Sequence, residues 1–155
     1  MGFSVSAATA IVFIAAFVSV GVLYSAGYAG FEQVEAATDA KHENALQAQN
    51  TAINITDVVH DADQPVEYVN LTVVNQGSTT LSVNATDVLL NGTYQKSYVT
   101  RTVSTGDGTV PAGSGGTDLW LPGETLRLSI QRNMSAPIHV YVVTETGVTA
   151  TEVSA

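Results

Sequence analysis

Few side chains in this 155-residue sequence are of the types that perform acid–base, nucleophilic or metal chemistry. The three histidines, His42, His60 and His139, fall on an expected helical stalk, in a loop and in a strand, and no two have the spacing of a metal-binding pair. Cysteine is absent, which excludes a disulfide framework, a thiolate nucleophile and cysteine-bound zinc. No serine lies in a G-x-S-x-G elbow. The sequence therefore predicts a protein that is not an enzyme and that has no cofactor.

Four acidic residues lie close together in the segment DVVHDADQPVE, namely Asp57, Asp61, Asp63 and Glu67. Their carboxylates could offer oxygen ligands to Ca²⁺, but the segment lacks the glycine and the distal bidentate glutamate of an EF-hand loop. We interpret them as solvated charges of a loop and predict no metal site.

The placement of asparagine is more informative. Five of the eight asparagines begin an N-x-[ST] triplet: Asn54, Asn70, Asn84, Asn91 and Asn133. These triplets are acceptors for N-glycosylation, so the sequence predicts five candidate glycosylation sites. They favour a location of the C-terminal part outside the cytoplasm.

The overall charge excludes one class of partner. The chain has 14 Asp and Glu against 5 Lys and Arg, a net charge of -9, and its basic residues are scattered along the sequence. An acidic surface without a basic cluster repels phosphate, so we expect neither nucleic-acid binding nor recognition of anionic lipid.

The elements that carry these residues are of two kinds, and the first is an apolar helix. No charged side chain occurs before Glu32, and the segment FSVSAATAIVFIAAFVSVGVLYSAGYAGF is apolar or small throughout. A helix needs only about 20 such residues to cross a bilayer. We predict that residues 1–31 form an uncleaved transmembrane helix, because a secretory signal would have a basic start and a shorter apolar run. A buried helix of a soluble protein is disfavoured, since a helix that is apolar all round needs a large domain to cover it.

Residues 32–50 (EQVEAATDAKHENALQAQN) continue this helix outward, because they are rich in Ala, Glu and Gln and contain no Gly or Pro. The expected helix from about Ser4 to Gln49 is about 70 Å long at 1.5 Å per residue. We interpret residues 32–50 as a solvated helical stalk. A weak coiled-coil neck is the alternative, although the a/d pattern does not persist for three heptads.

From Thr51 onward the pattern changes from helical to alternating, with many β-branched residues and frequent turn signals. Seven to nine short strands are expected in residues 51–155, which is typical of an all-β immunoglobulin-like β-sandwich. Asn91-Gly92 predicts a type I′ hairpin turn, and Leu121-Pro122-Gly123-Glu124 predicts a type II turn. Trp120 is interpreted as core filler between two sheets, with an exposed binding anchor as the alternative. Residues 106–116 (GDGTVPAGSGG) are expected to form a flexible loop.

A family resemblance rests on several segments in a fixed order. They are the opening MGFSVSAATAIVFIAAF, the stretch QAQNTAIN at the end of the stalk, VNQGSTTL at residues 74–81, DVLLNG at residues 87–92 and TDLWLPGE at residues 117–124. Together they resemble the FlaF-type stator and accessory proteins of the archaellum, the archaeal flagellum, in their haloarchaeal form. The FlaG-type stator proteins share this architecture.

The resemblance implies a stationary component of the archaellum motor. Such a protein is anchored in the cytoplasmic membrane by one helix, N-terminus inside, and its immunoglobulin-like domain lies in the pseudoperiplasm. The implied partners are the S-layer protein, a FlaG-like stator protein and a second copy in a homodimer. The acidic balance with two lysines also suits a halophilic protein.

The residues themselves suggest where a partner would bind. An open sandwich leaves edge strands that are either blocked or able to accept a partner strand. Our candidate edge is a segment in which apolar and polar residues alternate. It has one charge and contains no Pro: Val148, Thr149, Ala150, Thr151, Glu152 and Val153. Internal pairing of this strand is the alternative.

At the level of function, the competing hypothesis is a pilin- or archaellin-like filament subunit, although basic residues before a processing site are missing from residues 1–6.

Overall fold

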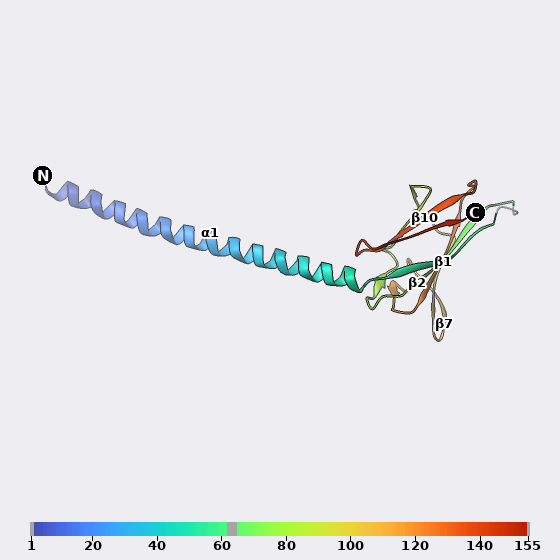
Figure 1. The fold of residues 1–155 in the computed structure, drawn as a ribbon. Coiled ribbons are helices and arrows are strands. Elements are labelled where there is room, and N and C mark those ends of the chain that lie inside the picture. The colour runs from blue at the N-terminus through green and yellow to red at the C-terminus, as the bar shows by residue number, and fades with distance from the viewer. Residues whose placement is uncertain (1, 62–64, 155) are drawn as a thin grey trace. The chain divides into compact units, whose positions relative to one another are not determined.

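The computed structural model describes residues 2–61 and 65–154. One helix and eleven strands follow one another along the described chain, the helix first (Figure 1). The chain divides into two compact units, Met1–Glu43 and Asn44–Ala155, which are described separately.

Helix α1 extends over Gly2–Asn50 without interruption. No Pro interrupts it, and hydroxyl side chains bond back to carbonyls of the preceding turn, as Ser19 Oγ does to Ala15 O at 2.8 Å. The side chains of residues 6–46 are exposed. Within the described residues α1 is the one helix that is long and apolar enough to cross a membrane, with a mean hydropathy of 2.3 in its most apolar window. The predicted long apolar helix is confirmed.

A five-stranded antiparallel sheet forms one layer of the second unit. Its strands, in spatial order, are β1 (Ile53–Asp61), β2 (Tyr68–Asn75), β9 (Thr125–Gln131), β6 (Thr100–Thr105) and β7 (Gly108–Pro111). The register between β1 and β2 shifts at Thr56, between Ile55 and Asp57, which marks a β-bulge.

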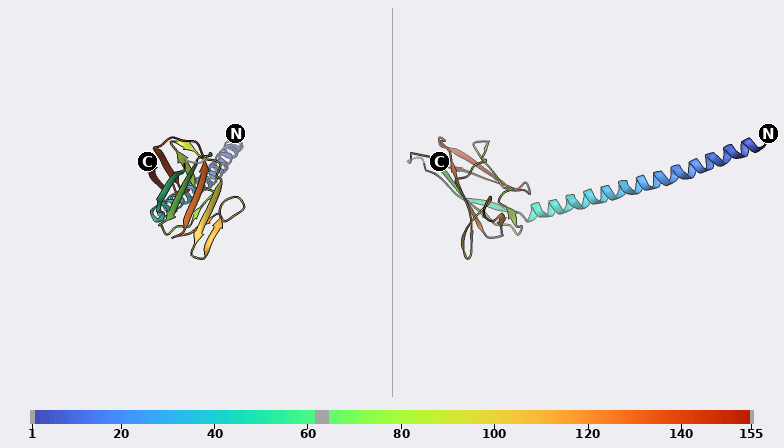
Figure 2. Two further views of the ribbon diagram at one scale, coloured as in Figure 1. Left: turned by 90° about the vertical axis from the view of Figure 1, so that its right-hand side faces the viewer. Right: turned by 180° about the vertical axis from the view of Figure 1, so that it is seen from behind.

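A four-stranded antiparallel sheet forms the other layer (Figure 2). Its order is β11 (Thr149–Ser154), β10 (Ile138–Val143), β4 (Asp87–Leu90) and β5 (Thr93–Tyr94). A short ladder of β3 (Leu81–Ser82) with β8 (Leu119–Trp120) completes the pairing. On one side of the sandwich β1 lies beside β11, and on the other side residues 95–99 cross from the four-stranded sheet to the five-stranded sheet.

The core lies between the two layers because alternate residues of each strand point inward. Val69, Leu71 and Val73 of β2 are buried, as are Val140 and Val142 of β10. Trp120 is completely buried, and its indole N–H donates to Glu124 O at 2.9 Å. The predicted β-sandwich is thus confirmed, and so is the interpretation of Trp120 as core filler.

Both predicted turns are present. Asn91 and Gly92 have φ values of 47° and 76°, the positive pair that a type I′ turn requires, and Leu90 pairs with Thr93 across them. Gly123 has φ 82°, and Glu124 N donates to Leu121 O at 3.1 Å, as in a type II turn.

Three expectations are corrected by the structure. Residues 106–116 are not one flexible loop, because β7 forms a hairpin with β6 inside them; Gly106-Asp107 makes the turn, and Thr109 and Val110 suit a strand. Asp57 and His60 belong to strand β1 and not to a loop, since pairing with β2 continues to Asp61. The eleven strands exceed the predicted seven to nine because β3, β5 and β8 have only two residues each.

Candidate partner-binding face

The side chains with catalytic potential are dispersed or already engaged. Glu67 Oε2 accepts a hydrogen bond from Met134 N at 2.9 Å and lies 3.4 Å from His60 Nε2, so it fixes the β9–β10 connection. Asp63 lies outside the described residues. Within residues 2–61 and 65–154 no group of three His, Asp or Glu side chains could hold a metal ion.

The outer faces of the two sheets differ in chemistry. The five-stranded sheet presents mainly amides, hydroxyls and a guanidinium, including Asn70 and Thr72 of β2 and Arg127 of β9. The four-stranded sheet presents large apolar and aromatic side chains. We call this second surface the aromatic face, and it consists of Leu89, Tyr94, His139, Tyr141, Thr151 and Val153.

Strand register makes the aromatic face continuous. Tyr141 on β10 lies opposite Leu89 on β4 and opposite Thr151 on β11. Leu89 in turn lies opposite Tyr94, so one row crosses all four strands. Opposed residues share a face of the sheet, with Cβ atoms about 5 Å apart. Tyr94, Tyr141 and Val153 are 47%, 39% and 50% exposed, which leaves a contiguous apolar area in contact with water.

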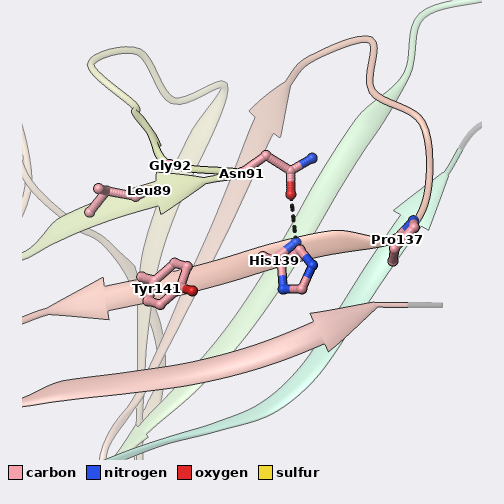
Figure 3. Close-up of a pocket in the computed structure, with 6 residues that line it drawn as sticks. All are labelled: Leu89, Asn91, Gly92, Pro137, His139 and Tyr141. Atoms are coloured by element: carbon pink, nitrogen blue, oxygen red, sulfur yellow. Dashed lines mark hydrogen bonds between the residues drawn. The ribbon is translucent and has the colours of Figure 1, made fainter.

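An open depression lies at one end of this face (Figure 3). Its lining residues are Leu89, Asn91, Gly92, Pro137, His139 and Tyr141. Asn91 Oδ1 accepts a hydrogen bond from His139 N, and Asn91 N donates to His139 O, both at 2.8 Å. These two bonds fasten the β4–β5 turn to β10, so the depression has a fixed backbone frame.

The hydroxyl at the β5 side of the face has a raised pKa. Asp87 raises the pKa of the Tyr94 phenol, by a hydrogen bond to its side chain and by its negative charge. The Tyr94 side chain combines an apolar ring with a polar end, and tyrosine is enriched at protein interfaces.

The predicted partner-binding segment forms an edge strand. Thr149 to Val153 belong to β11, Val148 lies in the preceding turn, and no described strand pairs with the outer side of β11. Thr144 N bonds to Val148 O at 3.0 Å. Since the bonding alternates along an antiparallel pair, the N–H groups of Thr149, Thr151 and Val153 point away from β10.

Two hydrogen bonds are made by residues at the C-terminal end of β11. Val153 N donates to the carboxylate of Glu152 at 3.4 Å, and Ser154 Oγ donates to Val58 O of β1 at 3.5 Å. The C-terminal end of β11 is therefore close to β1. Partner binding by Val148–Val153 stays a prediction.

The five asparagines of the N-x-[ST] triplets are all exposed: Asn54 in β1, Asn70 in β2, Asn84 and Asn133 in loops, and Asn91 in the hairpin turn. The side-chain oxygens of Asn84 and Asn91 accept hydrogen bonds from Arg101 and from His139 N. Their amide nitrogens, which would carry a glycan, are not used in these bonds. Glycosylation at the five positions stays a prediction.

Sequence reasoning missed the aromatic face. A signal for it was present, because the strand sequences IHVYVV and DVLL have large side chains at the outward positions as well as at the inward ones. When only one face of such a strand is buried in the core, the other exposes an apolar patch, which is a feature of interaction sites.

The chain thus combines a long apolar helix with a β-sandwich that has an exposed aromatic sheet face. The chain belongs to the archaeal-type flagellin family, whose family model matches residues 2–153. This match confirms the relationship to proteins of the archaeal flagellum that the sequence indicated.

Two solved structures from Sulfolobus acidocaldarius are similar to the chain. The archaellum periplasmic stator protein FlaG is 19% identical with a TM-score of 0.46, over 67% of this chain and 99% of that chain. The archaellum periplasmic stator complex of FlaF and FlaG is 19% identical with a TM-score of 0.44, over 66% of this chain and 87% of that chain. No curated protein sequence matches the chain.

Proposed function

We propose that this protein is a non-enzymatic stator component of the archaellum motor that ties the cytoplasmic membrane to the S-layer. A rotating filament delivers torque only if another element is held still against the envelope. An apolar helix in the bilayer, joined to a β-sandwich with an exposed binding face, is suited to that task. Family membership supports the assignment to the archaellum.

The observation that carries the proposal is the change from uncharged to acidic residues along α1 at Glu32. No charged residue precedes Glu32, and the helix has four acidic residues from there onward, at spacings of three, four and four: Glu32, Glu35, Asp39 and Glu43. These spacings place all four carboxylates on one face of the helix, about 16 Å long, with Lys41 on the opposite face.

This acidic stripe favours a helix that leaves the bilayer into water. All four of its side chains are exposed. In a filament core the same carboxylates would be packed against neighbouring helices, where unpaired charges are costly. A membrane-anchored stator keeps them solvated, with the N-terminus inside and the β-domain in the pseudoperiplasm.

The partners follow from the same assignment. The S-layer protein would bind at the β11 edge and the aromatic face, because main-chain pairing and adjacent apolar side chains together give affinity and specificity. A FlaG-like stator protein and a second copy of this chain are the other proposed partners. The edges at β5 and β7 offer surfaces for them that are separate from the β11 edge.

A filament subunit is the second candidate, and the family description favours it, because the matching family is that of archaeal-type flagellins. In this alternative the apolar part of α1 packs in a filament core after removal of a short leader.

Fractionation with N-terminal mass analysis distinguishes the two functions. We expect the protein from native cells to remain with the cytoplasmic membrane after the filaments are sheared off, with an intact N-terminus near Met1. Recovery in the sheared filaments with a shortened N-terminus would instead identify a filament subunit.

A further inference from the structure

The cationic side chains of the β-domain gather around one connection. Residues 51–155 contain four basic residues, and three of them, Lys96, Arg101 and Arg132, line two adjoining depressions along residues 94–102. The first depression includes Lys96 and Arg101, and the second includes Lys96 and Arg132. No carboxylate lines either depression within the described residues. The fourth basic residue, Arg127, contacts Ser104 on the outer side of the five-stranded sheet.

Arg101 is held in place on three sides. Its guanidinium lies over the ring of Tyr98, 5.0 Å from the centroid, and its Nη2 donates to Asn84 Oδ1 at 3.2 Å. Gly113 supplies the third contact: it has φ +79°, and a Cβ at this position would overlap the guanidinium. The charge is thus preorganised, which lowers the entropy cost of binding an anion.

Within residues 2–61 and 65–154, none of these three side chains forms an ion pair. Among residues 2–61 and 65–154 the one ion pair is that of His60 with Glu67. Arg101 bonds to a neutral amide oxygen, although the chain has 14 acidic residues. Lys96 and Arg132 are exposed to solvent, and Arg101 is half-buried.

The backbone adds further donors. Gln95 N bonds to Val88 O and Val99 N bonds to Ser129 O, which fixes both ends of the connection. The N–H groups of Lys96, Ser97 and Tyr98 between them lie outside the strands and have no partner in the described part of the chain. Cations and unpaired N–H groups together make a surface rich in donors, which suits carboxylates.

We propose that this surface, formed by Lys96, Arg101, Arg132 and the backbone of residues 96–98, docks an acidic peptide segment of a partner protein. The net charge of -9 repels long polyanions such as nucleic acids and acidic polysaccharides, whereas a short acidic segment can be held locally. The face of the Tyr98 ring, on which a base or sugar would stack, is covered by Arg101. The proposal goes beyond the stator function and does not rest on it.

The test uses the full chain in a neutral detergent and a fluorescein-labelled deca-glutamate peptide, with binding measured by anisotropy in 0.15 M KCl. Lys96→Glu and Arg132→Glu are each expected to raise the Kd about threefold to tenfold, because each removes an attraction and adds a repulsion. Arg127→Glu makes the same change of charge outside the surface and should alter the Kd less than about twofold.

A second pair of variants tests the position of Arg101 without changing charge. Gly113→Ala displaces the guanidinium and should weaken binding at least about threefold. Gly115→Ala is the matched control, because Gly115 also has a positive φ, +92°, but has open space around it, so binding should be kept. Near-UV circular dichroism identifies any variant that has lost its fold.

Three results would overturn the proposal. They are no binding of deca-glutamate by the wild type, an equal loss of affinity in Lys96→Glu, Arg132→Glu and Arg127→Glu, and competition by polygalacturonate as effective as by unlabelled peptide. The last result would identify an acidic polysaccharide as the better ligand.

Discussion

At the scale of single residues, the buried Asn75 side chain holds the segment that follows β2 in place. Asn75 is completely buried, and its amide donates to Thr79 O and Trp120 O at 2.9 and 3.1 Å. Its Oδ1 accepts from Gly77 N at 3.1 Å. A buried amide with all these bonds made stabilises one conformation of residues 75–79.

Gly77 is required in this segment because the backbone passes very close to it. A Cβ at Gly77 would lie 2.5 Å from Asn50 O and 2.6 Å from Ala52 N. We expect Gly77→Ala to lower the free energy of unfolding by about 2 kcal/mol, since backbone atoms cannot move away as a side chain can. Gly106→Ala, where the added Cβ meets nothing, is the control. Urea denaturation of residues 44–155 measures the free energy of unfolding of both variants. Equal stability of Gly77→Ala and Gly106→Ala would contradict the requirement for glycine at position 77.

Tyr98 gives the stability a dependence on alkaline pH. Burial raises the pKa of Tyr98 to about 12 from 10.0, with a further increase from Tyr94, while Arg101 lowers it. Because the folded-state pKa is above the unfolded value, the stabilisation is complete below pH 10 and is lost as the pH rises toward 12.

The measurement is the urea midpoint of residues 44–155 between pH 9 and pH 12. Tyr98→Phe cannot ionise, so its midpoint should fall less steeply over this range than that of the wild type. Parallel curves for the two proteins would show that Tyr98 ionises equally easily in both states.

At the scale of elements, strand β11 is the edge whose outward N–H groups can be changed one at a time. Thr149→Pro or Thr151→Pro removes an outward donor and should weaken capture of the S-layer protein by residues 44–155 in molar salt, with the fold kept. Ala150→Pro is the control, because the Ala150 N–H points to β10 and its loss should destabilise the sheet.

The results of this capture experiment test the anchoring function and the proposed binding edge separately. If wild-type residues 44–155 capture no S-layer protein, the anchoring function is wrong. If both threonine variants fold and bind normally, the edge is not the binding element, and the aromatic face around Tyr141 becomes the surface to mutate.

The sequence allowed prediction of most elements because local rules determine them. Alternation identified strands such as β2 and β9, and the positive φ tolerated by Asn91 and Gly92 identified the hairpin turn between β4 and β5. Strand β7 was missed, since glycine-rich sequences fit both a loop and a short edge strand.

Binding surfaces were less predictable because they depend on pairing between distant segments. Lys96, Arg101 and Arg132 are scattered in the sequence and gather only when residues 95–99 cross between the sheets. The aromatic face likewise requires the register of β10 with both β4 and β11, which is a tertiary property.

At the scale of the whole molecule, the β-domain should fold without the apolar part of α1. Its core and its turns are complete within residues 51–155, so far-UV circular dichroism of this fragment should be dominated by β-structure. A helical or disordered spectrum would contradict the fold.

A comparison of the free energies of unfolding of residues 44–155 and 51–155 tests whether the last turns of α1 stabilise the domain. Gln47 O accepts bonds from the hydroxyls of Thr51 and Thr79, and Asn50 O accepts from Ser78 N. Residues 44–155 should therefore be more stable than residues 51–155 by about 2 kcal/mol.

Salt should stabilise the domain, since residues 51–155 carry ten acidic and four basic side chains. Their mutual repulsion is screened over about 8 Å at 0.15 M and about 3 Å at 1 M salt. We expect the Tm of residues 51–155 to increase from low to molar KCl. An unchanged or decreasing Tm would contradict the halophilic interpretation.

The junction between α1 and β1 has a mechanical consequence. Only Thr51 and Ala52 separate the two elements, and the carbonyls of Asn50 and Ala52 accept bonds from the N–H groups of Gln76, Gly77 and Ser78. A pull transmitted from the helix to β1 passes through residues 50–52, and these three bonds tie that stretch to residues 76–78. We expect the stretch that follows the helix to stay attached to the segment after β2 under load until all three bonds have broken.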